Sequence, residues 1–323
     1  MDTLRAIFSA AFGYSLLRVS TPLLFASLAA VVSARAGVIN IGIEGMMLAA
    51  AFAGVAVSAF TASPWLGLLG AVVTGIVMAL ILAYFALKLK TDIILGGIAL
   101  NLLASGGTIF LLYVLAGDKG ISSSLPSKVL PQVQIPIIKD IPVVGDIFSN
   151  HNVLTYVAFL SVVVLYYFLY RTPLGLRLRA VGESPDAAAS VGVSVHRIQF
   201  IALGISGMLA GFGGAHLSMG YVSWFSRDMT AGRGFIGLAA SAMGGETPQG
   251  ALLTSLFFGF ADALSSYMQS LRIPSEFVQM IPYLATVLAL AVYANRQAAR
   301  KQAVSHRAAP KGSGTVVPDS GHH

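Results

Sequence analysis

The chain has 323 residues, of which 56% are hydrophobic and only 10% are charged, and its formal net charge is +7. Soluble domains carry roughly 25% charged residues, so most of this surface must face lipid. The sequence contains no cysteine and no metal-binding histidine spacing, which argues against metal sites, and no catalytic constellation emerges. The basic residues lie in short loops, which is typical of membrane topology rather than of nucleic-acid binding.

Long uncharged stretches predict an all-α polytopic membrane fold with about eight to ten transmembrane helices, because one crossing needs about 20 apolar residues. The clear candidates are Val19–Ala34, Gly45–Leu87 with a break at Thr61–Trp65, Ile93–Gly117, Asn152–Tyr170, Ile198–Ser226, Thr247–Leu271 and Phe277–Asn295.

Two Gly-rich segments, Ala36–Ile43 and Gly234–Gly245, are apolar but shorter than a full span. We expect both to be short or broken crossings packed inside the protein. Each precedes a Pro-marked turn and a Gly/Leu-rich span. This is either a faint repeat of two similar halves or chance similarity in a chain of this composition.

The distribution of Lys and Arg predicts the orientation in the membrane. The basic loop 171–197 and the basic tail are expected on the cytoplasmic side, and the Pro-rich, charge-balanced loop 118–152 outside. Counting crossings then predicts two cytoplasmic termini. The resulting organisation is a permease domain over 1–297 and a disordered cytoplasmic tail over 298–323.

The segment Leu178–Val193 predicts a short capped helix within the basic loop. Ser184 is a good N-cap, Pro185 suits the first helical position, and Asp186 favours the positive end of the helix dipole. Gly192 can end the helix in a left-handed turn. A helix of about two turns is marginal alone in water. This one is therefore either an interfacial connector or a projection that inserts into a groove of a cytoplasmic partner.

Several stretches resemble one transporter family. Leu178–Val193 resembles the coupling-helix loop of ATP-binding-cassette importer permeases. Gly37–Met47 (GVINIGIEGMM), Thr91–Asn101 (TDIILGGIALN) and the Gly234–Asp262 region are similar to permeases for branched-chain amino acids, ribose and other simple sugars, and nucleosides. The IGIEG and TDIILGG forms are most similar to the nucleoside (guanosine or purine nucleoside) branch, where two different permeases pair. The resemblance covers about residues 15–295.

The resemblance implies a permease subunit of an ATP-driven importer in the inner (cytoplasmic) membrane of a prokaryote, with a nucleoside as the expected solute. Its implied partners are ATPase subunits, a second and related permease, and an extracytoplasmic substrate-binding protein. This chain has no P-loop of its own, so ATP and Mg²⁺ would bind to the ATPase and this chain would hold no cofactor. The implied ATPase-coupling residues are Glu183, Ser184, Pro185, Asp186, Ala187, Ala188, Ala189 and Ser190.

Polar residues in the predicted spans are candidates for the translocation pathway, since such groups are costly in a membrane and often functional. The resemblance implies that Asn40, Glu44 and Asn101 lie near the translocation pathway, and Ser105 and Asp262 are further polar candidates within predicted spans. Each also has a structural interpretation: Glu44 could cap a broken helix, Asp262 could pair inside the bundle, and Asn101 could bond adjacent helices. His216 is interpreted as a packing residue.

Other functions stay open at this point. A ribose-type sugar permease is the nearest alternative, and a proton- or sodium-coupled secondary transporter using Glu44 or Asp262 is another. A passive channel is a third. An importer permease is inert without its ATPase, whereas the other two classes work without a partner.

Overall fold

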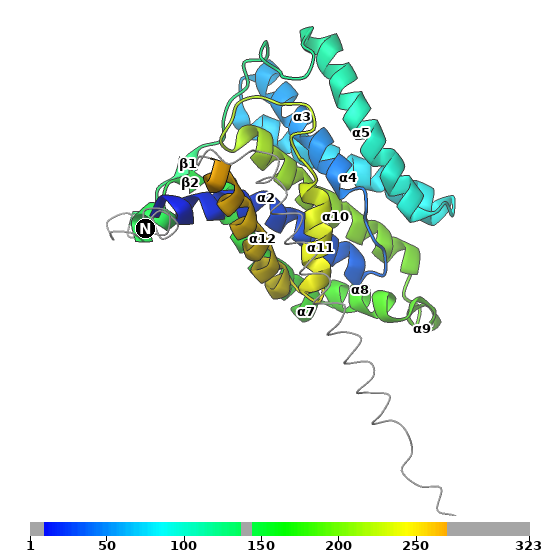
Figure 1. The fold of residues 1–323 in the computed structure, drawn as a ribbon. Coiled ribbons are helices and arrows are strands. Elements are labelled where there is room, and N and C mark those ends of the chain that lie inside the picture. The colour runs from blue at the N-terminus through cyan, green and yellow to red at the C-terminus, as the bar shows by residue number, and fades with distance from the viewer. Residues whose placement is uncertain (1–9, 137–143, 270–323) are drawn as a thin grey trace, which may run out of the picture.

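A computed structural model describes residues 10–136 and 144–269, which form a helical bundle with one two-stranded sheet (Figure 1). Six helices of this part are long and apolar enough to cross a membrane. They are α2 (Ala10–Arg35), α3 (Ile43–Thr61), α4 (Pro64–Ala83) continued by the π-helical turn η1 (Tyr84–Lys88), α5 (Ile93–Ala116), α7 (Val153–Arg171) and α10 (Val195–Met219). The predicted all-α membrane fold is confirmed.

The other elements are shorter or less apolar. They are α6 (Val144–Phe148), α8 (Pro173–Glu183), α9 (Pro185–Ser190), α11 (Arg233–Met243), α12 (Pro248–Gln269), and the antiparallel strands β1 (Gln132–Val133) and β2 (His151–Asn152). The predicted span Phe277–Asn295 and the predicted tail 298–323 lie outside the described residues.

Local signals set several helix ends where the sequence predicts them. Ser63 accepts a hydrogen bond from the Leu66 amide and begins α4, and Asn152 accepts one from the Leu154 amide and begins α7. Asp92 accepts from two amides at the start of α5. These side chains bind amides that have no partner within the first helical turn.

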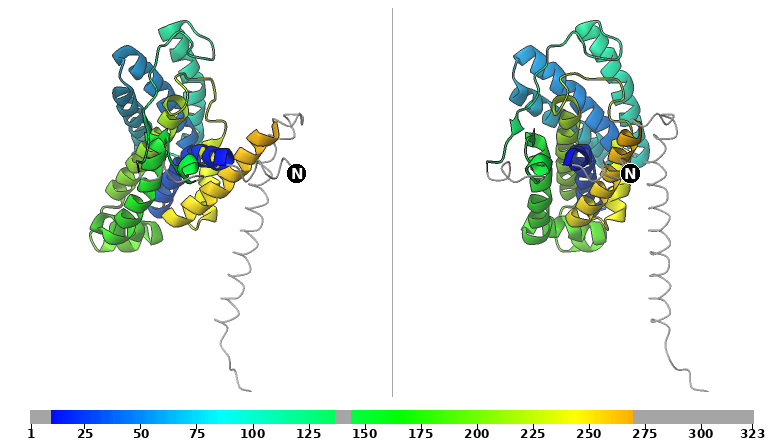
Figure 2. Two further views of the ribbon diagram at one scale, coloured as in Figure 1. Left: turned by 90° about the vertical axis from the view of Figure 1, so that its left-hand side faces the viewer. Right: turned by 60° about the vertical axis from the view of Figure 1, so that its left-hand side comes forward.

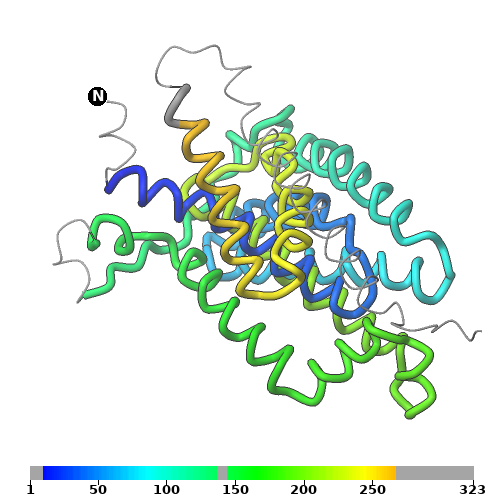
Figure 3. Tube along the Cα trace, turned by 60° about the horizontal axis from the view of Figure 1, so that its bottom comes forward, coloured from blue at the N-terminus to red at the C-terminus, as the bar shows by residue number. Residues whose placement is uncertain are grey.

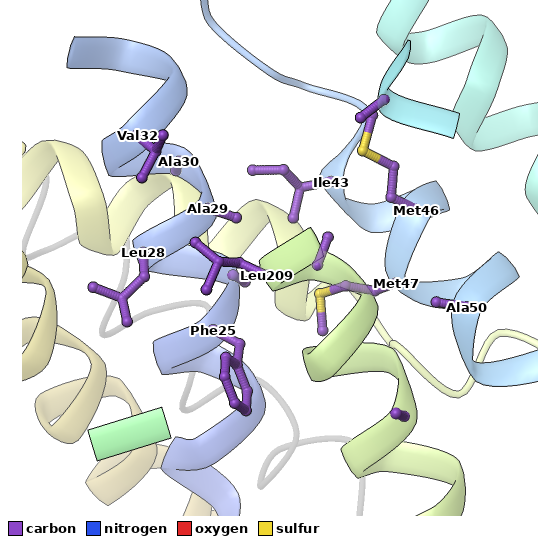
Figure 4. Close-up of a cluster of buried hydrophobic side chains, with 14 of the residues drawn as sticks. Phe25, Leu28, Ala29, Ala30, Val32, Ile43, Met46, Met47, Ala50 and Leu209 are labelled. Atoms are coloured by element: carbon purple, nitrogen blue, oxygen red, sulfur yellow. The ribbon is translucent and has the colours of Figure 1, made fainter. Parts of the chain in front are cut away.

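Helix α2 is the central element of the bundle and packs against α10, α11 and α12 (Figures 1 and 3). Every residue from Ser20 to Ser33 is buried, which is typical of a helix surrounded by protein on all sides. One buried hydrophobic cluster contains Phe25 and Leu28 of α2, Met47 of α3 and Leu209 of α10 (Figure 4). Figure 2 shows α11 and α12 side by side against this central helix.

The two ends of the bundle carry different loops. At one end the 118–136 segment meets the segment after α10, where Ile121 bridges to Ser226 and the Leu130 amide donates to the Met219 carbonyl. The start of α2 lies at this end, since the Tyr14 hydroxyl donates to the Asn150 carbonyl. At the other end, Arg35 Nε donates to the Glu246 carbonyl at 2.6 Å.

The prediction of a short crossing at Ala36–Ile43 is wrong. Helix α2 continues to Arg35, residues 36–42 are not helical, and α3 begins at Ile43. Gly37 has φ +74°, a left-handed conformation that commonly ends a helix. Consequently α2 starts at the end that carries the 118–152 loop, whereas the crossing count placed the N-terminus at the opposite end. The second short segment is a helix, α11.

Candidate functional site

The predicted capped helix in the basic loop is present as α9. Ser184 accepts from the Ala187 amide at 3.4 Å, and Pro185 occupies the first turn. Gly192 has φ +82°, and its amide donates to the Ala189 carbonyl, so the helix ends in the expected left-handed turn. Ser184 also ends α8, so a single residue joins the two helices.

Helix α9 projects from the end of the bundle that lies far from β1 and β2 (Figures 1 and 3). Its residues are exposed except Ala188, which is 4% exposed and faces its own chain. Val191 is 77% exposed directly after the helix. A groove of about 390 Å³ beside it is lined by Arg177 and Arg197 among others. This end therefore presents a small, capped helix with exposed apolar and basic neighbours.

Inside the bundle, Glu44 binds the start of α11. Its two carboxylate oxygens accept from the Gly232 amide at 2.8 Å and the Gly234 amide at 2.7 Å. Helix α11 has 11 residues and no side-chain cap from its neighbouring residues. Glu44 also lies in the first turn of α3. A carboxylate is stabilised at the positive end of a helix dipole, and here it lies between two such ends.

The depth of this contact follows from the length of α11. A helix of this size is about 16 Å long, roughly half of the hydrocarbon core of a bilayer. Its last residues lie beside Gly245 and Glu246, which bind Arg35 at the α8–α9 end. The Glu44 contact is therefore near the middle of the bundle, where backbone amides without a partner are costly.

Two other candidates bind the segment Asp228–Gly234, which leads into α11. Asp262 of α12 pairs with Arg233 at 3.3 Å, and Ser105 of α5 donates to Asp228 at 2.9 Å. Arg233 also donates to the Met229 and Thr230 carbonyls. Glu44, Ser105 and Asp262, which come from three different helices, thus converge on one segment, and no pattern in the sequence indicates this shared target.

Asn40 and Asn101 hold the non-helical turn before α3. Asn101 accepts from the Gly45 amide at 2.8 Å and donates to the Ile41 carbonyl at 3.0 Å. Asn40 is fully buried, accepts from the Gly42 amide, and donates to Ser206. Both amide side chains therefore replace the backbone hydrogen bonds that a continuous helix would make.

A second polar group lies closer to the 118–152 end and was not predicted from the sequence. A cavity of about 130 Å³ between α2, α10 and α11 is lined by Arg18, His216, Tyr221 and Arg233 among others. The Arg18 guanidinium lies 4.7 Å from the centre of the Tyr221 ring. The signal for this site in the sequence is a lone arginine, Arg18, just before the apolar stretch Val19–Ala34. Within the described ranges, no group of three or more His, Asp or Glu side chains could hold a metal ion.

A bundle of apolar membrane helices with a projecting capped helix and a polar interior defines a membrane transport component. The family described as "Branched-chain amino acid transport system / permease component" matches residues 14–290. The chain belongs to this family of permeases, and it is a transport subunit rather than an enzyme.

Three relatives illustrate the similarity. The chain is 37% identical to the guanosine ABC transporter permease protein NupQ of Bacillus subtilis, over 87% of this chain and 91% of that protein. It is 36% identical to the nucleoside ABC transporter permease protein NupC of Lactococcus lactis, over 87% of this chain and 92% of that protein. A second guanosine permease of Bacillus subtilis, NupP, is 27% identical over 87% of this chain and 81% of that protein.

The fold also has a solved counterpart. An ABC transporter captured in an inward-facing conformation shares the arrangement with a TM-score of 0.52, over 87% of this chain and 84% of that chain. The sequence identity is 17%, so the similarity concerns the fold alone.

Proposed function

We propose that this chain is one permease subunit of an ATP-driven nucleoside importer in a prokaryotic cell membrane. In this proposal α9 contacts a separate ATPase, which holds ATP and Mg²⁺. An extracytoplasmic substrate-binding protein meets the side that carries the 118–152 loop, and the 171–197 loop faces the cytoplasm. The solute assignment is supported by the two nucleoside-named relatives above 35% identity.

The observation that supports the proposal is the position of α9 between α8 and α10. It is exposed, it is joined to α8 through Ser184 alone, and the short turn after it leads into α10. Helix α10 packs against α2, α3 and α4, and its far end leads into the segment that Glu44 and Asp262 hold. A displacement of α9 by an ATPase would therefore reach the polar centre of the bundle through one continuous helix.

The second permease is proposed to be a different chain of the same family. Two distinct permeases carry the guanosine name in Bacillus subtilis, and both are similar to this chain over most of its length. Co-purification of a tagged copy with an untagged copy tests the alternative. Recovery of the untagged copy from cells lacking any related permease would contradict the heteromeric arrangement.

The test of the docking role is Ala187→Trp in the assembled importer. Ala187 is exposed, so a bulky side chain would block the contact without crowding the bundle, whereas Ala188 is buried and would report on packing. We expect nucleoside uptake to be abolished while the amount of inserted protein is unchanged. The matched control is Val163→Trp, an exposed position in the middle of α7 and away from both ends of the bundle, which should transport normally.

The solute is tested by uptake of labelled guanosine in cells that lack other nucleoside carriers, with ribose as competitor. We expect guanosine uptake that stops when the ATPase is inactivated and that excess ribose does not reduce. Uptake of ribose in place of guanosine would contradict the nucleoside assignment. Uptake that continues without the ATPase would contradict the importer class.

A further inference from the structure

The cavity between α2, α10 and α11 is small and polar. Its volume of about 130 Å³ corresponds to about four water molecules, so it suits the flat fused rings of one nucleobase rather than a whole nucleoside. It lies beside Arg233, the first residue of α11, and extends toward Tyr221 at the 118–152 end. The cavity is therefore on the side of the α11 terminus that faces incoming solute in the proposed orientation.

His216 gives this cavity unused hydrogen-bonding capacity. It is 3% exposed, and neither ring nitrogen has a hydrogen-bond partner among the described residues. Native proteins contain few such buried groups, and each calls for an explanation. A neutral imidazole offers one donor and one acceptor. The interpretation of His216 as a packing residue with satisfied nitrogens is therefore not supported by its surroundings.

Arg18 gives the cavity a net positive charge. Arg233 is paired with Asp262, whereas Arg18 forms no ion pair within the part of the chain that the structure describes. Its guanidinium presents N–H donors in a rigid planar fork. Arg18 is exposed at the edge of the cavity, so its guanidinium is accessible to a solute.

Tyr221 supplies an aromatic face that is held in place. Nε2 of His151 donates to the Ile147 carbonyl, so Nδ1 of the neutral ring carries no hydrogen. Nδ1 therefore accepts from the Tyr221 hydroxyl at 2.9 Å. The Tyr221 ring then lies edge to face with His216 at 5.6 Å and under Arg18. Aromatic side chains of this kind stack with nucleobases.

From these contacts we propose that the cavity binds the base of a 6-oxopurine nucleoside. The Arg18 fork donates to O6 and N7, His216 contacts a further polar edge of the base, and Tyr221 packs against the ring. Arginine is the side chain that pairs bidentately with these two acceptors, whereas glutamine pairs with the N6 amino group and N7 of adenine. This inference rests on the proposed function as a nucleoside permease.

The test is Arg18→Gln in the assembled importer, with the uptake efficiencies of guanosine and adenosine measured in the same preparation. We expect the ratio of guanosine to adenosine uptake efficiency to fall by about 5- to 150-fold. This is the discrimination that one bidentate contact to a base provides. The contribution of the binding protein cancels, because wild type and variant share it. The matched control is Arg227→Gln, an exposed arginine in the loop after α10, which should keep the wild-type ratio.

A second variant distinguishes a loss of base binding from misfolding. His216→Leu removes a buried group without a partner, so we expect a higher melting temperature together with weaker guanosine uptake at low solute concentration. A purely structural histidine would change stability and leave the concentration dependence of uptake unchanged.

The outcomes separate this inference from the proposed function. Absence of nucleoside uptake by the wild-type importer would overturn the proposed function and this inference with it. Nucleoside uptake with an unchanged guanosine-to-adenosine ratio in Arg18→Gln would overturn the cavity assignment alone, and so would an equal change in Arg227→Gln.

Discussion

Helices α9 and α11 are both short, yet different parts of the chain hold them in place. Helix α9 is capped by Ser184, ended by Gly192, and exposed over most of its surface. Helix α11 has no cap of its own, and its first amides are bound by Glu44, about 190 residues away in sequence. The start of α9 is therefore capped by its own neighbouring residue, whereas the start of α11 depends on a side chain from another helix.

The largest expected effect concerns the close approach of α11 to α3. A Cβ atom at Gly234 would lie 2.6 Å from Glu44 Cα, so Gly234→Ala must push the two helices apart. We expect the stability to decrease by about 3 kcal/mol and transport to be lost. Thermal unfolding measures the first effect, and nucleoside uptake measures the second. The matched control is Gly106→Ala in α5, where nothing lies within 4 Å. Equal behaviour of the two variants would show that α11 is not held at this contact.

The next effect tests the cap itself. Glu44→Gln keeps the size of the side chain but removes the charge and turns an NH₂ group toward an amide donor. We expect the free energy of unfolding to decrease by about 2 kcal/mol and transport to weaken. Unfolding in denaturant measures the first effect, and nucleoside uptake measures the second. Glu183→Gln, an exposed carboxylate at the end of α8, should leave stability unchanged. If Glu44→Gln matched it, the distant cap would have no energetic role.

A smaller effect is expected in α9. Ser184→Ala removes the local cap and should weaken this helix by about 1 kcal/mol without changing global unfolding, because little of the bundle packs on it. Hydrogen exchange of the Ala187 amide should increase, while exchange in α10 stays at the wild-type rate. A decrease in the global melting temperature comparable with that of Glu44→Gln would remove the contrast between the two helices.

The smallest effect is a pH dependence at the loop that positions Tyr221. Burial lowers the pKa of His151, and its hydrogen bond to the Ile147 carbonyl opposes this only in part. The unfolded chain therefore binds this proton more readily, so stability is lost as pH falls below about 6.5. Melting temperatures between pH 8 and pH 5 should decrease less in His151→Gln than in wild type. Identical slopes would mean that His151 does not contribute.

Much of the fold was predictable because its signals are local. Apolar length predicted the spans, and the structure shows that Ser63, Asp92 and Asn152 cap the starts of α4, α5 and α7. The same reasoning predicted the bounds of α9 almost to the residue. It was wrong at Ala36–Ile43, where apolar composition suggested a crossing and Gly37 instead ends a helix.

The candidate site was predictable as a set of residues but not as an arrangement. Glu44, Asp262 and Ser105 were selected because they are polar within apolar spans, yet their common target, the segment Asp228–Gly234, depends on contacts between distant helices. Nothing in the sequence relates Arg18 to His216, because no sequence pattern relates two single polar residues on different helices. Their proximity at one cavity is a property of the packing alone.

The single-residue junction at Ser184 has a consequence for how such subunits acquire partners. In the proposed function α9 contacts the ATPase, and all of its residues except Ala188 are exposed. Under this proposal, exchange of residues 184–192 between related permeases would redirect a subunit to another ATPase while its solute path stays intact. Diversification of partner choice and of cargo choice could then proceed independently within one chain.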